Sequence, residues 1–219
     1  MHHATSRVAA ALLLAAASLP AMAQYDSVGL YMFGHVGQSS IDLGSERRAL
    51  DQFLVDAGAT NLSSSLDDED TAYKLGLGLQ LNRYFALEGT WVDLGEFSYK
   101  GVANEGSLKL DLESSGFGGH LVGRLPFDYG LSVYAKAGWH ALKTKVSAKG
   151  IAAGGGSASA SDDDTESVGS WAVGAAWQFA PQFSVVGEFE RYRDVGSDDL
   201  SGGDADVDFW SLGLRYDLL

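Results

Sequence analysis

Apolar side chains alternate with small or polar ones in eight segments of the chain, and a period of two is typical of a β-strand. The clearest run, residues 73–81, places a tyrosine and four leucines on one face, with Lys74, two glycines and Gln80 on the other. The pattern therefore predicts eight strands, an even number. They span residues 28–36, 73–81, 85–91, 117–125, 133–140, 171–179, 183–190 and 210–218.

The connections between these segments alternate in length. Tight turns surround Asn82, residues 126–130 and Pro181. Strand pairs joined alternately by short turns and long loops are typical of outer-membrane barrels, with the turns in the periplasm and the loops outside. The long, polar and acidic connections span residues 38–70, 95–110, 143–167 and 193–206.

Two stretches within the long connections have patterns of their own. Residues 45–58 carry apolar side chains at helical spacing, with Ser45 as a candidate cap and Gly58 as a stop. We expect a short amphipathic helix over the barrel mouth, and a partner-binding helix is the sharper hypothesis. Residues 148–161 are rich in Gly, Ala and Ser, which predicts a flexible loop.

The two faces of the strands differ in a way that suits a membrane. One face is apolar and aromatic towards the strand ends, as in the interfacial girdles of lipid-facing barrels. The other carries small and charged residues that suit a narrow lumen. The predicted fold is all-β: an eight-stranded antiparallel up-and-down transmembrane β-barrel. A soluble lipocalin-like barrel is the alternative, because alternation alone does not assign inside and outside.

The N-terminal segment is typical of an export signal. A polar start with Arg7 precedes an apolar stretch over residues 8–19, and Ala21 and Ala23 form a small-x-small cleavage pattern before Gln24. We therefore expect a signal peptide over residues 1–23 and a barrel domain over residues 24–219. The expected location is the outer membrane of a Gram-negative bacterium.

Composition removes several classes of protein. The chain has no cysteine, which excludes disulfide scaffolds and thiolate metal sites. Its formal net charge of −14 repels phosphate backbones, so we expect no nucleic-acid partner. Acidic clusters in the connections lack the spacing of an EF-hand loop, and solvated charge is the simpler interpretation. We expect no cofactor and no metal.

The inward face of the predicted strands collects charged side chains and histidines. Buried charges are tolerated when paired, so these residues predict a polar network filling the lumen, with a narrow conductive path as the alternative. His120 and His140 also suggest a lipid A-modifying enzyme, whose chemistry uses a histidine with a serine and a carboxylate. No nucleophile–base motif in the sequence has the required spacing. The network residues are His35, Lys74, Glu88, His120, Arg124, Lys136, Glu188, Glu190, Arg215 and Asp217.

Several segments resemble the transmembrane barrel of the OmpA family. Residues 78–88 contain a Gly-x-Gln-x-Asn-x-Tyr turn followed by an inward glutamate, Glu88, and residues 133–138 and 211–216 are also similar. The resemblance implies the barrel fold over essentially the whole chain after the signal. It also places Glu88 at the glutamate of that family's ion-pair switch. The other switch positions carry Val122, Gln178 and Val186, and the final strand carries Leu218 where an aromatic is usual.

These observations predict a non-enzymatic outer-membrane anchor whose acidic extracellular loops support surface interaction or adhesion. A narrow channel for ions or small solutes is the second hypothesis, and a lipid A-modifying enzyme the third. The expected partners are outer-membrane lipid and lipopolysaccharide, the barrel-assembly machinery during biogenesis, and a host or surface ligand contacted through the loops.

Overall fold

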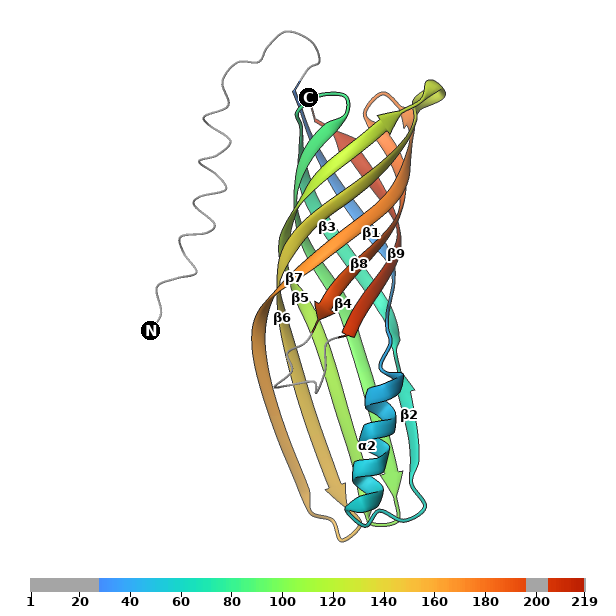
Figure 1. The fold of residues 1–219 in the computed structure, drawn as a ribbon, viewed down its shortest axis with the longest axis vertical. Coiled ribbons are helices and arrows are strands. Elements are labelled where there is room, and N and C mark those ends of the chain that lie inside the picture. Colours follow the sequence, from blue (N-terminus) through green and yellow to red (C-terminus); the bar gives the residue numbers. More distant parts are fainter. Residues whose placement is uncertain (1–27, 196–204, 219) are drawn as a thin grey trace, which may run out of the picture.

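The computed structural model describes residues 28–195 and 205–218, so the predicted signal peptide and its cleavage site lie outside the described residues. The chain forms an antiparallel barrel with a sheet that continues past one end of it (Figure 1). Its elements, in chain order, are β1 (Gly29–Ile41), α2 (Gly44–Asp56), β2 (Ser63–Asp67), β3 (Glu69–Gln80), β4 (Phe85–Ala103), β5 (Gly106–Pro126), the 3₁₀ turn η1 (Asp128–Gly130), β6 (Leu131–Ala152), β7 (Ser157–Ala180), β8 (Phe183–Val195) and β9 (Ala205–Asp217).

Eight strands close the ring. Strand β1 pairs with β3 on one side and with the last strand, β9, on the other, while β4 pairs with both β3 and β5. Every barrel strand therefore has two antiparallel neighbours, and closure leaves no open edge within the ring. The eight predicted barrel strands are confirmed. The ninth strand, the short β2, lies within the first long connection and pairs with the far end of β4.

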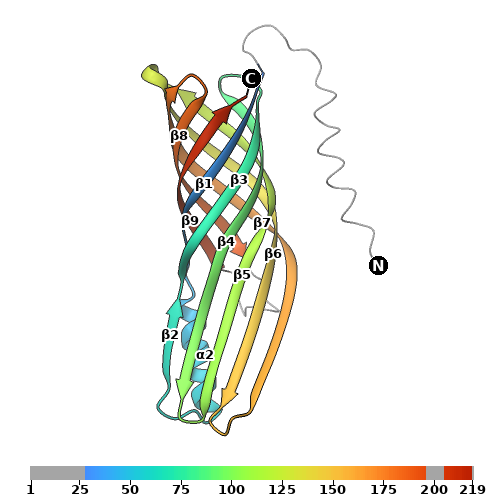
Figure 2. The same cartoon turned by 180° about the vertical axis from the view of Figure 1, so that it is seen from behind.

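Two of the predicted long loops are in fact strands. Residues 95–110 and 143–167 belong almost entirely to the β4–β5 and β6–β7 hairpins, which run well past the barrel (Figure 2). The predicted flexible loop over residues 148–161 is also wrong, because only the turn at residues 153–156 separates β6 from β7. Residues 147–161 carry mostly small or polar side chains on both faces, so they lack the alternation that signals a strand, whereas residues 97–101 and 106–112 do alternate. The backbones of both hairpins continue the ladder of hydrogen bonds.

The predicted helix is present, with two differences. It begins at Gly44 with Leu43 at the cap position, so Ser45 lies in the first turn and is not the cap. It does not lie across the barrel mouth but runs along the projecting sheet, next to β2 and β4 (Figures 1 and 2). Gly58 follows the helix with φ +100°, a conformation that glycine adopts readily, as the predicted stop requires.

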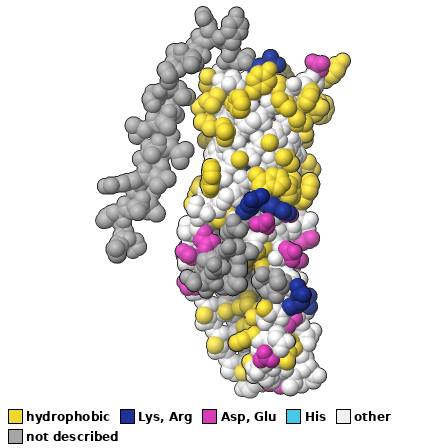
Figure 3. Space-filling view, viewed as in Figure 1, with side chains coloured by type: hydrophobic (Ala, Val, Ile, Leu, Met, Phe, Trp, Pro, Cys, Tyr) yellow, Lys and Arg dark blue, Asp and Glu magenta, His cyan; other side chains and the backbone are white. Residues whose placement is uncertain are grey.

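The outer face of the barrel is apolar. Side chains such as Leu75, Leu77, Phe117 and Leu212 are more than half exposed, and Trp139 and Trp210 mark one end of this band. Figure 3 shows hydrophobic side chains gathered over the half of the barrel next to the short turns, with most charged side chains on the other half. A soluble barrel would bury these side chains, so the lipocalin-like alternative is excluded. Within the described residues, no helix is both long and apolar enough to cross a bilayer.

Candidate functional site

Two lysines and three glutamates form a network across the middle of the lumen, which we call the central network. The Lys74 ammonium contacts the carboxylates of Glu188 and Glu190, the latter at 2.5 Å. Lys136 Nζ lies 2.6 Å from Glu88 and 2.7 Å from Glu188. All five side chains are buried. Strands β3, β4, β6 and β8 each contribute to the network, so barrel closure is what brings these charges together.

Two tyrosines complete the coordination of the carboxylates. Tyr31 Oη donates a hydrogen bond of 2.6 Å to Glu88, and Tyr134 Oη donates one of 2.7 Å to Glu188. Each ring lies directly over a glycine of the next strand, Gly78 or Gly174, where a Cβ atom would overlap the ring. The glycines therefore make room in a narrow lumen for two aromatic rings. Both tyrosines fall on the inward face of the predicted strands, but we did not predict their part in the network, because only their pairing across the lumen reveals it.

The histidines lie one layer farther from the short turns. His120 Nε2 is 2.9 Å from Ser170 Oγ and 2.8 Å from Glu190 Oε1, and His140 contacts Thr90 and Ser170. A Ser–His–acid relay needs the hydroxyl and the carboxylate on different ring nitrogens. Here both share Nε2, while His120 Nδ1 is buried without a hydrogen-bond partner. The geometry is therefore that of a packed polar layer and differs from that of an assembled triad.

The same histidines and Glu190 also place three ligand atoms within 4.8 Å of one another. The Glu190 carboxylate already accepts hydrogen bonds from the Lys74 ammonium and pairs with His120. A divalent cation at this position would face that ammonium at close range, so the donor set suits an ion-pair layer better than a metal.

Apolar layers close the lumen on both sides of the central network. On the side of the short turns, Tyr31 and Phe33 pack with Val122, Ala176 and Val186. On the other side lies a larger cluster that we call the apolar plug. Its fully buried members include Val92, Leu94, Leu142, Tyr192, Val207 and Phe209. An eight-stranded barrel is just wide enough for side chains to fill it, and this lumen is filled in successive layers.

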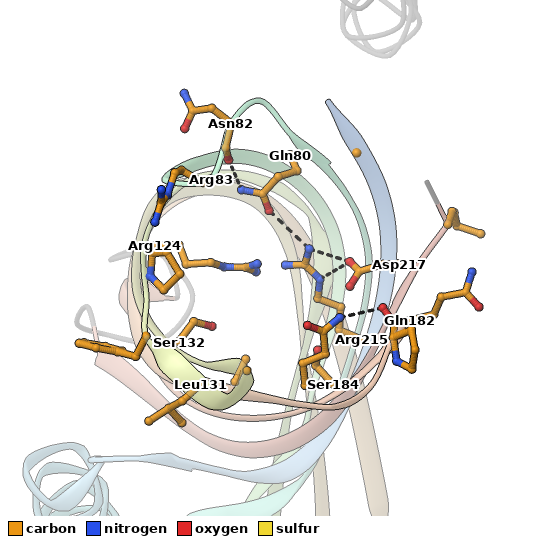
Figure 4. A pocket seen from close by; sticks show the side chains of 18 residues that line it. Gln80, Asn82, Arg83, Arg124, Leu131, Ser132, Gln182, Ser184, Arg215 and Asp217 are labelled. Atoms are coloured by element: carbon orange, nitrogen blue, oxygen red, sulfur yellow. Dashed lines mark hydrogen bonds and ion pairs between the residues drawn. The ribbon is translucent and has the colours of Figure 1, made fainter. Parts of the chain in front are cut away.

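The remaining predicted lumen residues take part in none of the central network's ion pairs that the structure describes. His35 is buried beside Ser211, at 3.1 Å. Arg124, Arg215 and Asp217 line a cavity of about 540 Å³ at the short-turn end, which we call the mouth (Figure 4). Arg215 pairs with Asp217 at 2.7 Å and lies over the Tyr31 ring at 3.6 Å. Within the described residues no ion pair joins these arginines to the central network, although both arginines line one small cavity with Glu88 and Lys136. The predicted single network therefore consists of two groups of ion pairs that adjoin at this cavity.

The projecting sheet and its helix form a second region of interest. We call it the platform: α2, β2 and the ends of β4–β7 beyond the apolar plug. Tyr99 Oη on β4 donates a 2.6 Å hydrogen bond to Asp51 of α2, and Leu54 of α2 lies against Gly101. Burial and the Asp51 carboxylate raise the pKa of Tyr99 to about 12. The helix is therefore held on the inner face of the sheet by specific contacts.

A clasp and an apolar groove lie at the tip of the platform. Glu105 accepts hydrogen bonds from the Thr60 hydroxyl at 2.6 Å and from the Thr60 backbone at 2.8 Å, which lower the pKa of this carboxyl. Beside this clasp is a groove of about 530 Å³ lined by Leu54, Leu62 and Leu108 with several small residues. None of these contacts was predicted, because Thr60 and Glu105 lie in two separate connections that only the folded platform brings together.

A closed antiparallel barrel with an apolar outer face and a charged, filled interior defines an outer-membrane β-barrel protein. The family model described as "Outer membrane protein beta-barrel domain" matches residues 9–217, and the chain belongs to this family. The short turns and the mouth are accordingly periplasmic, and the platform is extracellular.

Solved structures of similar proteins include three outer-membrane barrels. Neisserial surface protein A is 13% identical over 88% of this chain and 99% of that one, with a TM-score of 0.49. Ail of Yersinia pestis is 15% identical over 88% and 100%, with a TM-score of 0.46. The protease OmpT of Escherichia coli is 9% identical over 92% and 99%, with a TM-score of 0.47. No curated protein sequence matches the chain.

Proposed function

We propose that this protein is a non-enzymatic anchor that holds a rigid extracellular platform for contact with a host or surface ligand. The single observation that carries the proposal is the continuation of β4–β7 past the apolar plug as a hydrogen-bonded sheet with a helix on its inner face. Long flexible loops would lose conformational entropy on binding, whereas a preformed sheet avoids most of that cost.

The apolar groove at the tip is the part of the platform best suited to contact. Leu108 lines the groove from the inner face of the sheet. Val102 lies on the neighbouring strand β4, points to the outer face, is 44% exposed and does not line the groove. A negative charge at Leu108 would face the groove, and the same charge at Val102 would face open water.

The test compares Leu108→Glu with the matched control Val102→Glu in cells that display the protein. We expect Leu108→Glu to reduce adhesion to host cells or an immobilised surface by at least about tenfold, and Val102→Glu to leave it unchanged. Surface labelling confirms equal display. If cells carrying the native protein adhere no better than cells without it, the adhesion role is wrong.

The filled lumen supports an anchor over a channel. The contact of both Ser170 and Glu190 with the same nitrogen of His120, Nε2, supports an anchor over an enzyme. Planar-bilayer recordings with defined conductance steps would contradict the first inference. A change in lipid A mass on overexpression would contradict the second.

We also propose that the apolar band contacts outer-membrane lipid and lipopolysaccharide, and that the barrel-assembly machinery receives β9. Trp139 and Trp210 lie at the extracellular end of the band, where aromatic side chains suit the lipid interface. Since β9 leads to Leu218 and not to an aromatic residue, Leu218→Phe should increase the yield of assembled barrel in outer-membrane fractions. An unchanged yield would contradict a role of residue 218 in recognition by the barrel-assembly machinery.

A further inference from the structure

The periplasmic mouth concentrates positive charge in an acidic protein. Arg83, Arg124 and Arg215 line it, against one carboxylate, Asp217. The chain as a whole has a formal net charge of −14. Asp217 is already engaged by Arg215, and among residues 28–195 and 205–218 neither Arg83 nor Arg124 forms an ion pair.

The two inner arginines have unused hydrogen-bond donors. Arg124 Nε and Arg215 Nη1 are both buried without a hydrogen-bond partner, and Arg124 forms no ion pair within residues 28–195 and 205–218. Buried guanidinium N–H groups are costly to leave unpaired, so their arrangement points to a ligand. Figure 4 shows the Arg124 side chain reaching across the mouth towards Arg215.

The surroundings suit an oxyanion. Ser132 and Ser184 are buried residues that line the same cavity and carry hydroxyl donors. The cavity volume of about 540 Å³ accommodates a group larger than a single inorganic ion. Arginine forks bind carboxylates and phosphates through paired hydrogen bonds, and a concave site with one sign of charge concentrates counter-ions.

We infer that the mouth is a binding site for an oxyanion, a carboxylate or a phosphate group of a periplasmic molecule, held between Arg124 and Arg215. Arg215 is fixed by Asp217 and by its stacking on Tyr31, and forms the rigid wall of the site. Arg124, whose Nε is buried without a hydrogen-bond partner in the part of the chain that the structure describes, supplies the other half of the clamp.

The test is calorimetric titration of the full chain, folded in detergent micelles, with sodium phosphate and separately with sodium acetate. We expect saturable binding of at least one anion that weakens as sodium chloride is raised. Binding of phosphate alone identifies a phosphate-bearing ligand, and binding of acetate alone identifies a carboxylate.

The variants compare the same change inside and outside the mouth. Arg124→Gln should weaken binding by at least about tenfold, since it removes a charge-assisted contact. Arg124→Lys keeps the charge without the fork and should give an intermediate loss, and it serves as the test if Arg124→Gln does not fold. Arg48→Gln, on the exposed face of α2, should bind as the native protein does. Heat-modifiable gel mobility establishes folding of each variant.

Two results would overturn the inference. One is that neither phosphate nor acetate gives a saturable heat of binding. The other is equal affinity in the native protein and in the folded Arg124 variants, which would place the anion elsewhere on the surface.

Discussion

Lys136 offers the sharpest test of the central network. Its ammonium lies between Glu88 and Glu188. The same nitrogen, Nζ, lies 5.0 Å from the centroid of the Phe33 ring and 5.1 Å from that of the Tyr134 ring. Lys136→Met keeps most of the apolar stem but removes the charge. Three buried carboxylates then face Lys74 alone.

The expected loss is large because the remaining carboxylates cannot reach water. Removing one partner of a buried ion pair costs about 3–5 kcal/mol. The matched control is Lys143→Met, which removes an ion pair of 2.9 Å to Asp163 whose side chains are 57% and 56% exposed. Such an exposed pair contributes at most about 1 kcal/mol.

Urea unfolding in short-chain lipid vesicles, followed by tryptophan fluorescence, measures both values. The native network has one more glutamate than lysine. A double variant, Lys136→Met with Glu88→Gln, restores that balance and should recover about half of the lost stability. If Lys136→Met costs no more than Lys143→Met, or if the double variant is as unstable as the single one, the account of the lumen as a compensated ion-pair network is wrong.

Three further predictions test the packing and the platform. Gly78→Ala should destabilise the barrel by about 1–3 kcal/mol in the same unfolding assay, because its Cβ would overlap the Tyr31 ring. The raised pKa of Tyr99 means that the contribution of the Tyr99–Asp51 hydrogen bond to helix docking is complete below pH about 10 and is lost as the pH rises through about 12. Tyr99→Phe should remove this late step from a near-ultraviolet titration. The lowered pKa of Glu105 means that its clasp is complete above the pH at which a free glutamate titrates, about 4.3, and is lost as the pH falls through the lowered value. The amide resonance of Thr60 should shift in that acid range, and Glu105→Gln should abolish the shift.

The layered lumen connects the anchor role to stability. A barrel that conducts must keep a continuous wet path, but here apolar layers lie on both sides of the central network. The charges therefore serve cohesion between strands distant in sequence, such as β3 and β8. Mutations in the network should change stability strongly and surface binding only indirectly.

Much of the barrel was predictable because the membrane imposes a simple pattern. Where a strand has lipid on one face and a narrow lumen on the other, side chains alternate, and residues 73–81 or 210–218 carry that signal without any tertiary information. The same alternation assigned Lys74, Glu88 and Glu188 to the interior. The predicted helix was present for a similar reason, since its spacing of apolar residues is local.

The sequence by itself thus determined the fold class, the inward and outward faces and the identity of the buried charges. Only the tertiary structure decided which charges meet, because Lys74 and Glu188 are 114 residues apart and barrel closure makes them neighbours. It also decided that the projecting hairpins are strands: residues 147–161 are mostly small or polar on both faces, so the pattern is weak there while the backbone hydrogen bonds continue. For the same reason, only the closed barrel shows that Arg124 forms no ion pair with the central network among the described residues.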